Sequence, residues 1–143
     1  HAISDEDVKN IMQHPRASIA SDGPMMVFGV GKPHPRSYGT YPRVLGKYVR
    51  EQNIISLPEA IRKMTSLPAK VLSIQDRGLI KEDYFADIVV FNEKTISDNA
   101  TFQNPHQYSN GVEHVLINGV IVIMDGKHTG AKPGKVLHGP GYK

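Results

Sequence analysis

The 143 residues are enough for one folded domain with a core, and the lack of cysteine excludes disulfides and thiolate metal ligands within the chain. The net charge of +3 comes from 17 Lys and Arg residues against 14 Asp and Glu residues, and because these are scattered we expect no nucleic-acid partner. No apolar run approaches the roughly 20 residues of a membrane span and no signal-peptide pattern opens the chain, so we expect no membrane partner and a cytoplasmic location.

The first predicted elements are a helix, a short strand and a long loop. Residues 4–12 predict a helix that Ser4 caps and Pro15 ends. Its expected buried face comprises Val8, Ile11 and Met12. The stretch "ASIAS", residues 17–21, is typical of a strand buried on both faces. Residues 23–39 hold four Gly and three Pro among 17 residues, too many for regular structure, and so long a loop is more often functional than idle.

Helices are predicted again after this loop. Residues 41–52 carry an apolar stripe that predicts a helix. The stripe comprises Val44, Leu45, Tyr48 and Val49. Ser56 and Glu59 form a capping box that opens the next helix, which we expect Pro68 to break. The expected buried side of that helix comprises Ala60, Ile61, Met64 and Leu67. A further helical turn or two is predicted over residues 69–74.

The second half of the chain predicts antiparallel strands. The β-branched run "ADIVVFN", residues 86–92, is typical of a strand. In "HVLINGVIVIMDGK", residues 114–127, an Asn-Gly pair at 118–119 between two apolar runs predicts a hairpin. An Asp-Gly pair at 125–126 is expected to end that hairpin. The Gly- and Pro-rich tail, residues 130–143, is expected to be peripheral.

Another Asp-Gly pair, Asp22 and Gly23, follows the strand predicted over 17–21. An ordinary turn is one interpretation, because Asp bonds its own backbone and Gly tolerates positive φ. The other interpretation is that the strand presents Asp22 as a lone functional carboxylate beside the long loop. One strand cannot form a parallel sheet, so its neighbours are expected from other chains or from residues upstream of this sequence.

Five stretches carry a family resemblance, in this order along the chain. They are "SDG" from residue 21, "KPHPRSYGTYPRVLGKYVRE" from 32, "SLPEAIRKMTSLPA" from 56, "DRGLIKEDYFADIVVFN" from 76 and "NGVEHVLINGVIVIMDGKHTGAKPGKVL" from 110. Together they resemble the C-terminal third of an N-acyl-D-amino-acid deacylase, also called D-aminoacylase, of the amidohydrolase superfamily. The strand and the hairpin resemble many amidohydrolases, whereas "HPRSYGTYPRVLG" is typical of the D-aminoacylase branch.

The resemblance implies an α/β fragment of a metal-dependent (β/α)8 barrel with a small β-sandwich. Residues 1–75 would be the C-terminal part of the barrel, with 17–21 as its eighth and last strand. The helix over 4–12 would be the seventh barrel helix and the helix over 41–52 the eighth. Residues 76–143 would be the C-terminal strands of the sandwich. In such a barrel the active site lies at the carboxyl ends of the strands, which is where Asp22 would stand.

The resemblance also implies a reaction, the zinc-dependent cleavage of the amide of N-acyl-D-amino acids to a carboxylate and a free D-amino acid. One or two zinc ions would lower the pKa of a bound water to about 7. Asp22 would act as general base and then general acid, and it is a candidate metal contact. His34 and Arg36 are candidates for binding substrate, since Arg grips carboxylates in a bidentate manner. The alternative is that both only pin the loop to its neighbours.

The chain departs from the family in its metal ligands. The histidines and the cysteine or modified lysine of the family's earlier strands are absent, and no His-x-His pair occurs. The seven histidines lack ligand spacing; they are His1, His14, His34, His106, His114, His128 and His138. We therefore expect this chain alone to be inactive and its exposed apolar faces to be covered by the remainder of the barrel or by self-association. The alternatives are a cyclic-amide hydrolase resembling hydantoinases or dihydroorotases, and a non-catalytic β-rich binding or assembly module.

Overall fold

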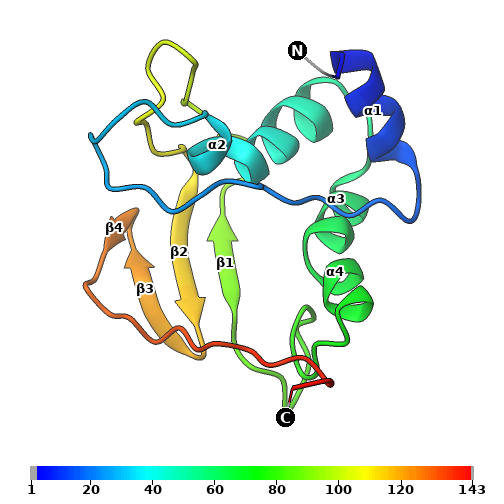
Figure 1. Cartoon of the computed structure of the whole chain (residues 1–143), viewed down its shortest axis with the longest axis vertical. Helices are drawn as coiled ribbons and strands as arrows, with labels where there is room; N and C mark the ends of the chain where they lie inside the picture. The colour runs from blue at the N-terminus through cyan, green and yellow to red at the C-terminus, as the bar shows by residue number, and fades with distance from the viewer. Residues whose placement is uncertain (1–2, 143) are drawn as a thin grey trace.

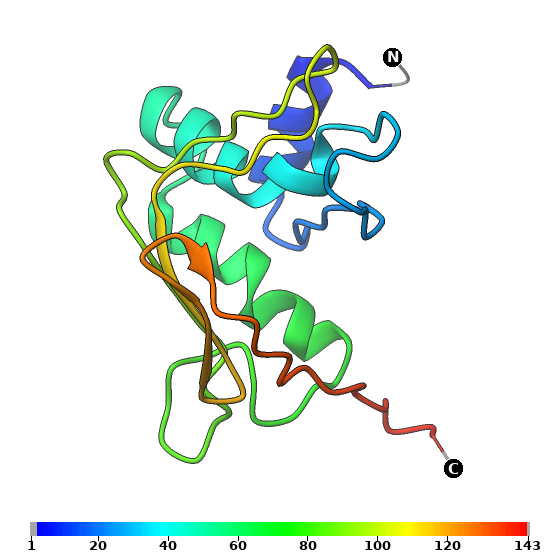
Figure 2. The same ribbon diagram turned by 90° about the vertical axis from the view of Figure 1, so that its left-hand side faces the viewer.

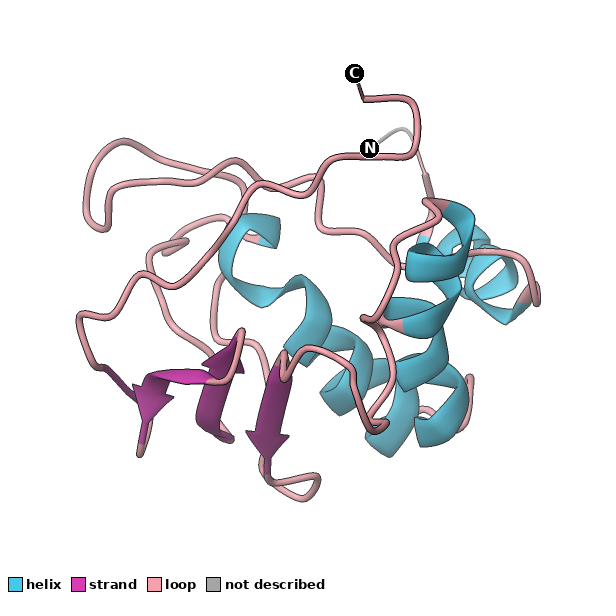
Figure 3. Cartoon of the chain, turned by 90° about the horizontal axis from the view of Figure 1, so that it is seen from below, coloured by secondary structure: helices cyan, strands magenta, loops and turns pink. Residues whose placement is uncertain are grey.

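A computed structural model describes residues 3–142, in which helices lie on one side and a small sheet on the other (Figures 1 and 3). The helices are α1 (Asp5–Gln13), α2 (Arg36–Arg43), the π-helix η1 (Val44–Glu51), α3 (Leu57–Met64) and α4 (Ser66–Val71). The strands are β1 (Ile88–Phe91), β2 (Val112–Ile117), β3 (Val120–Met124) and β4 (Lys127–His128). No helix among residues 3–142 is long and apolar enough to cross a membrane.

Helix α1 begins as predicted, with Ser4 as its N-cap. The Ser4 hydroxyl accepts from the Asp7 backbone N–H at 3.0 Å, and the Asp7 carboxylate accepts from the Ser4 N–H at 3.1 Å, which completes a capping box. The predicted buried face is only partly right. Met12 is buried and Val8 half-buried, but Ile11 is 55% exposed. Ile11 instead lines the mouth of a pocket described below.

The predicted start of the second helix at residue 41 is wrong, because α2 begins at Arg36 and runs through Pro42 into η1. Pro42 has no N–H to offer the carbonyl four residues before it, which is that of Tyr38. The Ser109 hydroxyl donates to that carbonyl at 3.2 Å, so the carbonyl is paired and the helix continues. The predicted apolar stripe is confirmed, since Val44, Leu45 and Tyr48 are buried and Val49 packs against the core.

The break expected at Pro68 is also misplaced. Helix α3 ends at Met64, and α4 starts at Ser66 with Pro68 in its first turn, where a missing N–H costs nothing. The Ser56 hydroxyl caps α3 by accepting from the Glu59 backbone N–H at 3.4 Å. The Glu59 carboxylate does not close the capping box but binds cations of its own helix, as described below.

Residues 17–21 form no strand, which corrects the strand predicted there. Figure 1 shows this part of the chain as a run without regular structure that leads from α1 to the long loop. Its Ile19 N–H donates to the carbonyl of Lys63 at 3.0 Å, a contact with a helix end and not with a strand. A strand exists only beside another strand, and the sheet of this chain lies elsewhere.

The sheet is an antiparallel meander in the order β1-β2-β3-β4. The predicted hairpin is confirmed: Asn118 and Gly119 have φ of 50° and 79°, the left-handed pair that a two-residue turn needs. Asp125 and Gly126, with φ of 49° and 72°, form a second such turn that joins β3 to β4. The predicted strand over 86–92 is confirmed as β1.

One core joins the helices to the sheet side. Its buried residues are Met12, Val44, Leu45, Tyr48, Ala60 and Ile96, with Phe91 and Val112 of the sheet packed against them. Arg50 of η1 donates to the carbonyls of Glu93 and Ile96, at 3.1 and 2.6 Å, which ties η1 to the β1–β2 connection. The tail, residues 130–142, lies at the periphery, as predicted, and runs away from the helices and sheet in Figure 2.

Candidate functional site

Asp22 lies where residues 17–21 meet the long loop, and Arg36 lies where that loop meets α2. The Asp22 Oδ2 and the Arg36 Nη2 form an ion pair at 2.9 Å. The Asp22 side chain is 83% exposed, and its backbone has a φ of 46°, which is uncommon for a residue other than glycine. The pair therefore joins the two ends of the loop and leaves most of the carboxylate open to solvent.

A pocket of about 650 Å³ lies beside this pair. Its walls come from α1, residues 17–20, the start of α2 and residues 100–103. His34 and Arg36 line the pocket, but Asp22 is not among its lining residues. The lining is largely apolar and includes Arg36 and Arg43, which pair with Asp22 at 2.9 Å and with Asp98 at 2.7 Å.

The structure brings Arg36 to both Asp22 and His34. The His34 Nδ1 accepts from the Arg36 backbone N–H at 3.0 Å, and the His34 ring meets that of Phe102 edge-on at 4.9 Å. His34 thereby holds the first backbone N–H of α2 and contacts the β1–β2 connection. These contacts agree with the alternative that His34 pins the loop, and its place in the pocket wall leaves the prediction of substrate binding open.

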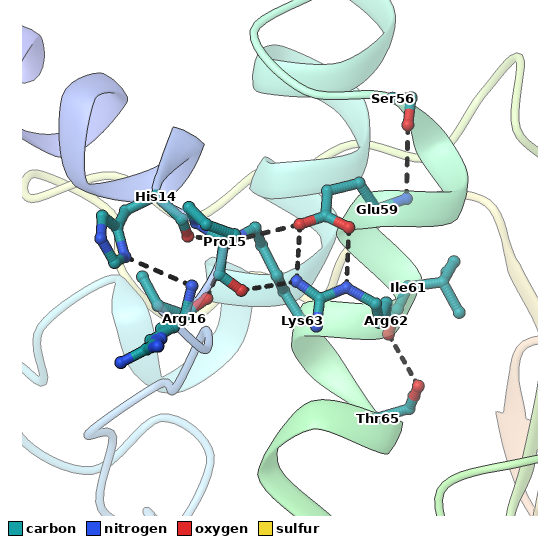
Figure 4. A network of polar contacts seen from close by, with 10 residues as sticks. His14, Pro15, Arg16, Ser56, Glu59, Ile61, Arg62, Lys63 and Thr65 are labelled. Carbon is teal, nitrogen blue, oxygen red and sulfur yellow. Dashed lines mark hydrogen bonds and ion pairs between the residues drawn. The ribbon is translucent and has the colours of Figure 1, made fainter.

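Two cations of α3, Arg62 and Lys63, bind backbone carbonyls of the segment that leads from α1 to Asp22 and are called the clamp below (Figure 4). The Lys63 side chain has no exposed surface, and its ammonium donates to the carbonyls of His14 and Ala17, the latter at 3.0 Å. Arg62 donates to the carbonyl of Pro15 at 2.7 Å. Contacts to three carbonyls within four residues thus fix the turn after α1. The sequence reasoning missed this role of Lys63, although a lysine between apolar positions 60, 61 and 64 was a visible signal of a buried charge.

Glu59 offsets part of the positive charge of this clamp. Its carboxylate accepts two hydrogen bonds from Arg62, both at 2.7 Å, and lies 3.4 Å from the Lys63 ammonium. The hydrogen bonds from Arg62 hold the pKa of Glu59 at about 2, below its ordinary value of 4.5. Glu59 is therefore ionised over the whole range in which the protein would work.

The residues present do not form a zinc site by themselves. No group of three or more His, Cys, Asp or Glu side chains that could hold a metal occurs within residues 3–142. A protein zinc ion takes three or four side-chain ligands, and Asp22 offers one carboxylate that already faces Arg36. Of the seven histidines, His1 lies outside the described residues.

Comparison with known proteins gives the family. Residues 2–123 match the amidohydrolase family, so the chain belongs to that family. An N-acyl-D-aspartate deacylase of Alcaligenes xylosoxydans xylosoxydans is 45% identical over 92% of this chain and 26% of its own length. A D-aminoacylase with a binuclear metal center is 36% identical, with a TM-score of 0.83 over 90% of this chain and 27% of the relative.

A third relative is the N-acyl-D-glutamate deacylase from Bordetella bronchiseptica, solved with zinc and a phosphonate inhibitor that mimics the tetrahedral intermediate. It is 38% identical, with a TM-score of 0.78 over 88% of this chain and 27% of the relative. These matches confirm the resemblance to N-acyl-D-amino-acid deacylases. The chain spans about a quarter of the length of these relatives, rather than the third expected from the sequence.

Proposed function

We propose that the chain is the C-terminal part of a longer, zinc-dependent hydrolase that cleaves N-acyl-D-amino acids to a carboxylate and a free D-amino acid. The observation that carries this proposal is the identity of 36–45% to deacylases of such substrates over about nine-tenths of the chain. The one-quarter coverage of those relatives agrees with the lack of a complete metal site among residues 3–142. The chain by itself is inactive in this proposal.

The proposal includes a place in the whole fold. Residues 1–75 are the last βα unit of a (β/α)8 barrel and residues 76–143 belong to a β-sandwich. In support, residues 17–21 have no strand beside them, and the pocket of about 650 Å³ opens along that segment. The Ser37 hydroxyl is buried without a hydrogen-bond partner among residues 3–142, and native proteins rarely leave such a group unpaired. The remainder of the barrel, or a second copy of the chain, covers these surfaces.

The roles of the site residues follow from their chemistry. Asp22 takes a proton from the attacking water and then gives it to the departing nitrogen, as a general base and acid. Arg36 holds the substrate carboxylate; its fork of five N–H donors can bind that carboxylate and Asp22 together. His34 holds the start of α2, and with it Arg36, against the pocket. Zinc, bound mainly by ligands outside this chain, supplies a water of lowered pKa in the complete enzyme.

The test uses the complete protein with Asp22→Asn, and Asp125→Asn as its matched control. Both aspartates precede a glycine and both side chains are 83% exposed, so the two variants lose the same charge in similar settings. Asp22→Asn should lower kcat for N-acetyl-D-amino acids by about a hundredfold to ten-thousandfold, with zinc content and melting temperature little changed. Asp125→Asn should keep full activity. Wild-type activity in Asp22→Asn would remove the role of Asp22, and a complete protein that hydrolyses none of these amides would remove the proposed function.

A further inference from the structure

The loop between Asp22 and α2, residues 23–35 and called the site loop below, is mostly exposed. Its apolar side chains face solvent, with Met25 fully exposed, Val27 71% exposed and Val30 60% exposed. Within the loop, the Val30 N–H donates to the Val27 carbonyl at 3.1 Å. A loop with so little internal bonding needs an anchor elsewhere to hold one conformation. That anchor lies in the β1–β2 connection, which runs beside the site loop in Figure 1.

The anchor is the imidazole of His106. Its Nδ1 lies 3.2 Å from the Gly29 N–H and 2.8 Å from the Tyr38 hydroxyl, and its Nε2 lies 3.0 Å from the Gly31 carbonyl. A backbone N–H can only donate, so Nδ1 is an acceptor; a carbonyl can only accept, so Nε2 carries the hydrogen. The hydrogen bonds thus assign a neutral ring with its hydrogen on Nε2, which holds the middle of the site loop at two backbone atoms.

Aromatic packing reinforces this contact. The Phe28 ring stacks on that of Tyr108 at 5.0 Å and 18°, and it meets His106 edge-on at 5.6 Å. Tyr38 of α2 lies edge-on to Phe28 at 6.2 Å. The four rings of Phe28, Tyr38, His106 and Tyr108 are called the aromatic latch below. Phe28 and Tyr38 come from the site loop and the helix that follows it, whereas His106 and Tyr108 come from the distant β1–β2 connection, so the latch joins the site loop and α2 to that connection.

The β1–β2 connection is itself firmly held where it carries His106. The Asn99 amide donates to the Tyr108 carbonyl at 2.8 Å and to Asn110 Oδ1 at 3.0 Å, and the Gln107 amide donates to the Asn99 carbonyl at 2.7 Å. Ile96, at the base of the connection, is 2% exposed in the core. The latch therefore rests on the sheet side of the molecule and not on another loose loop.

We propose that His106 is a positioning residue for the site: its neutral imidazole fixes the site loop and so sets how Asp22 and Arg36 face each other. The loop begins directly after Asp22 and ends directly before Arg36, and these two residues pair at 2.9 Å. Holding the middle of the loop restricts both of its ends. His106 itself contacts neither the pocket nor the ion pair, so it acts through the loop and not on the substrate. The fixing of the site loop by His106 does not depend on the proposed function, whereas the effect of His106 on the reaction does.

The first test measures the loop alone, in the complete protein, by the rate at which chymotrypsin cuts between Phe28 and Gly29. His106→Ala should raise that rate by about tenfold or more, because opening of the loop limits cleavage. His106→Asn keeps an acceptor near the position of Nδ1 and should raise it much less. His128→Ala, at an exposed histidine of β4, should leave the rate unchanged. A wild-type rate in His106→Ala would overturn the proposal, whether or not the protein is a deacylase.

The second test measures the reaction, with the melting temperature of each variant as a check on folding. His106→Ala should lower kcat/KM for an N-acetyl-D-amino acid by about tenfold to a hundredfold, since small misplacements of reacting groups have effects of this size. His106→Asn should recover most of the loss, and Tyr38→Phe, which removes one hydrogen bond to Nδ1, should cause a smaller loss in the same direction. Equal losses in His106→Ala and His106→Asn would overturn the positioning role.

Discussion

The two Asp-Gly pairs of the chain, at 22–23 and 125–126, look alike in the sequence but are built differently. Both aspartates have a positive φ, 46° at Asp22 and 49° at Asp125, and both side chains are 83% exposed. Gly126 has a φ of 72°, and the nearest atom to an added Cβ there would be 3.7 Å away. Gly23 has no positive φ, and an added Cβ would lie 2.8 Å from the Cα of Ser37.

The comparison separates local from distant causes of structure. The second pair is a hairpin turn, for which glycine supplies a backbone conformation that other residues avoid, and its aspartate lies 3.8 Å from His114 of the neighbouring strand β2. At the first pair glycine supplies space for the start of α2, and Asp22 pairs with Arg36 across the site loop. The Asp-Gly dipeptide therefore predicts the structure at residues 125–126 fully and the structure at residues 22–23 only in part.

The largest effect on stability should come from Lys63→Met. This variant removes one of the two cations of α3 that hold the segment leading to Asp22 and Gly23. The variant leaves the His14 and Ala17 carbonyls without their donor in a part-buried place, at a cost of about 3 kcal/mol. Urea unfolding should show this loss, and hydrogen exchange should show lost protection of the Ile19 amide while the amides of the β2–β3 hairpin stay protected. Lys70→Met, at an exposed lysine of α4, is the control. Equal loss of protection in both regions would mean that the clamp supports the whole fold and not the site segment in particular.

A smaller loss of stability is expected from Gly23→Ala. Comparing it with Gly126→Ala tests why each Asp-Gly pair needs its glycine. The new Cβ meets backbone of Ser37, which cannot move aside as a side chain could, so unfolding stability should fall by about 2 kcal/mol. Gly126→Ala meets no such atom and costs only the strain of a positive φ, about 1 kcal/mol. Urea unfolding of the two variants under the same conditions measures the difference. The reverse order would show that backbone conformation, not space, sets the need for glycine at position 23.

The smallest effect on stability should be the loss of the contribution of Glu59 at acidic pH. Glu59 has a pKa of about 2 in the folded protein, against an ordinary value of 4.5, so the unfolded chain takes up its proton first. Its contribution to stability is complete above about pH 4.5 and is lost as the pH falls toward 2. As the pH falls from about 4.5 toward 2, the Ile19 amide should lose protection from hydrogen exchange relative to the amides of the β2–β3 hairpin. Asp5 and Asp7 also have lowered pKa values, so Glu59→Gln is needed as the control, and it should remove the trend.

Local signals in the sequence predicted much of the fold. The two-residue turn at 118–119, the cap at Ser4 and the apolar stripe of η1 each depend on neighbours within a few positions, and all three are confirmed. The continuation of α2 through Pro42 was not predictable in this way. It is supported by a hydrogen bond from Ser109 to the Tyr38 carbonyl, between residues that are far apart in the sequence.

The site was predicted less completely, for the same physical reason. The sequence singled out Asp22, His34 and Arg36, and the structure brings Arg36 to both of the others; their catalytic and binding roles stay proposals. His106 and Lys63 were not found, because what matters is which distant backbone atoms they bind. The segment 17–21, predicted as a strand, has no strand beside it among residues 3–142, and apolar composition alone cannot provide one.

The shared core has a consequence for how such chains can be recombined. Ile96, from the connection between β1 and β2, is buried among residues of α1, η1 and α3, and Arg50 donates a hydrogen bond to the carbonyl of Ile96. A chimera that joined the helices of one relative to the sheet of another would cut through a single packed interior and would not connect two independent modules. Substitutions on the two sides are therefore expected to have accumulated in matched pairs, with a change of volume in one offset by a change in the other.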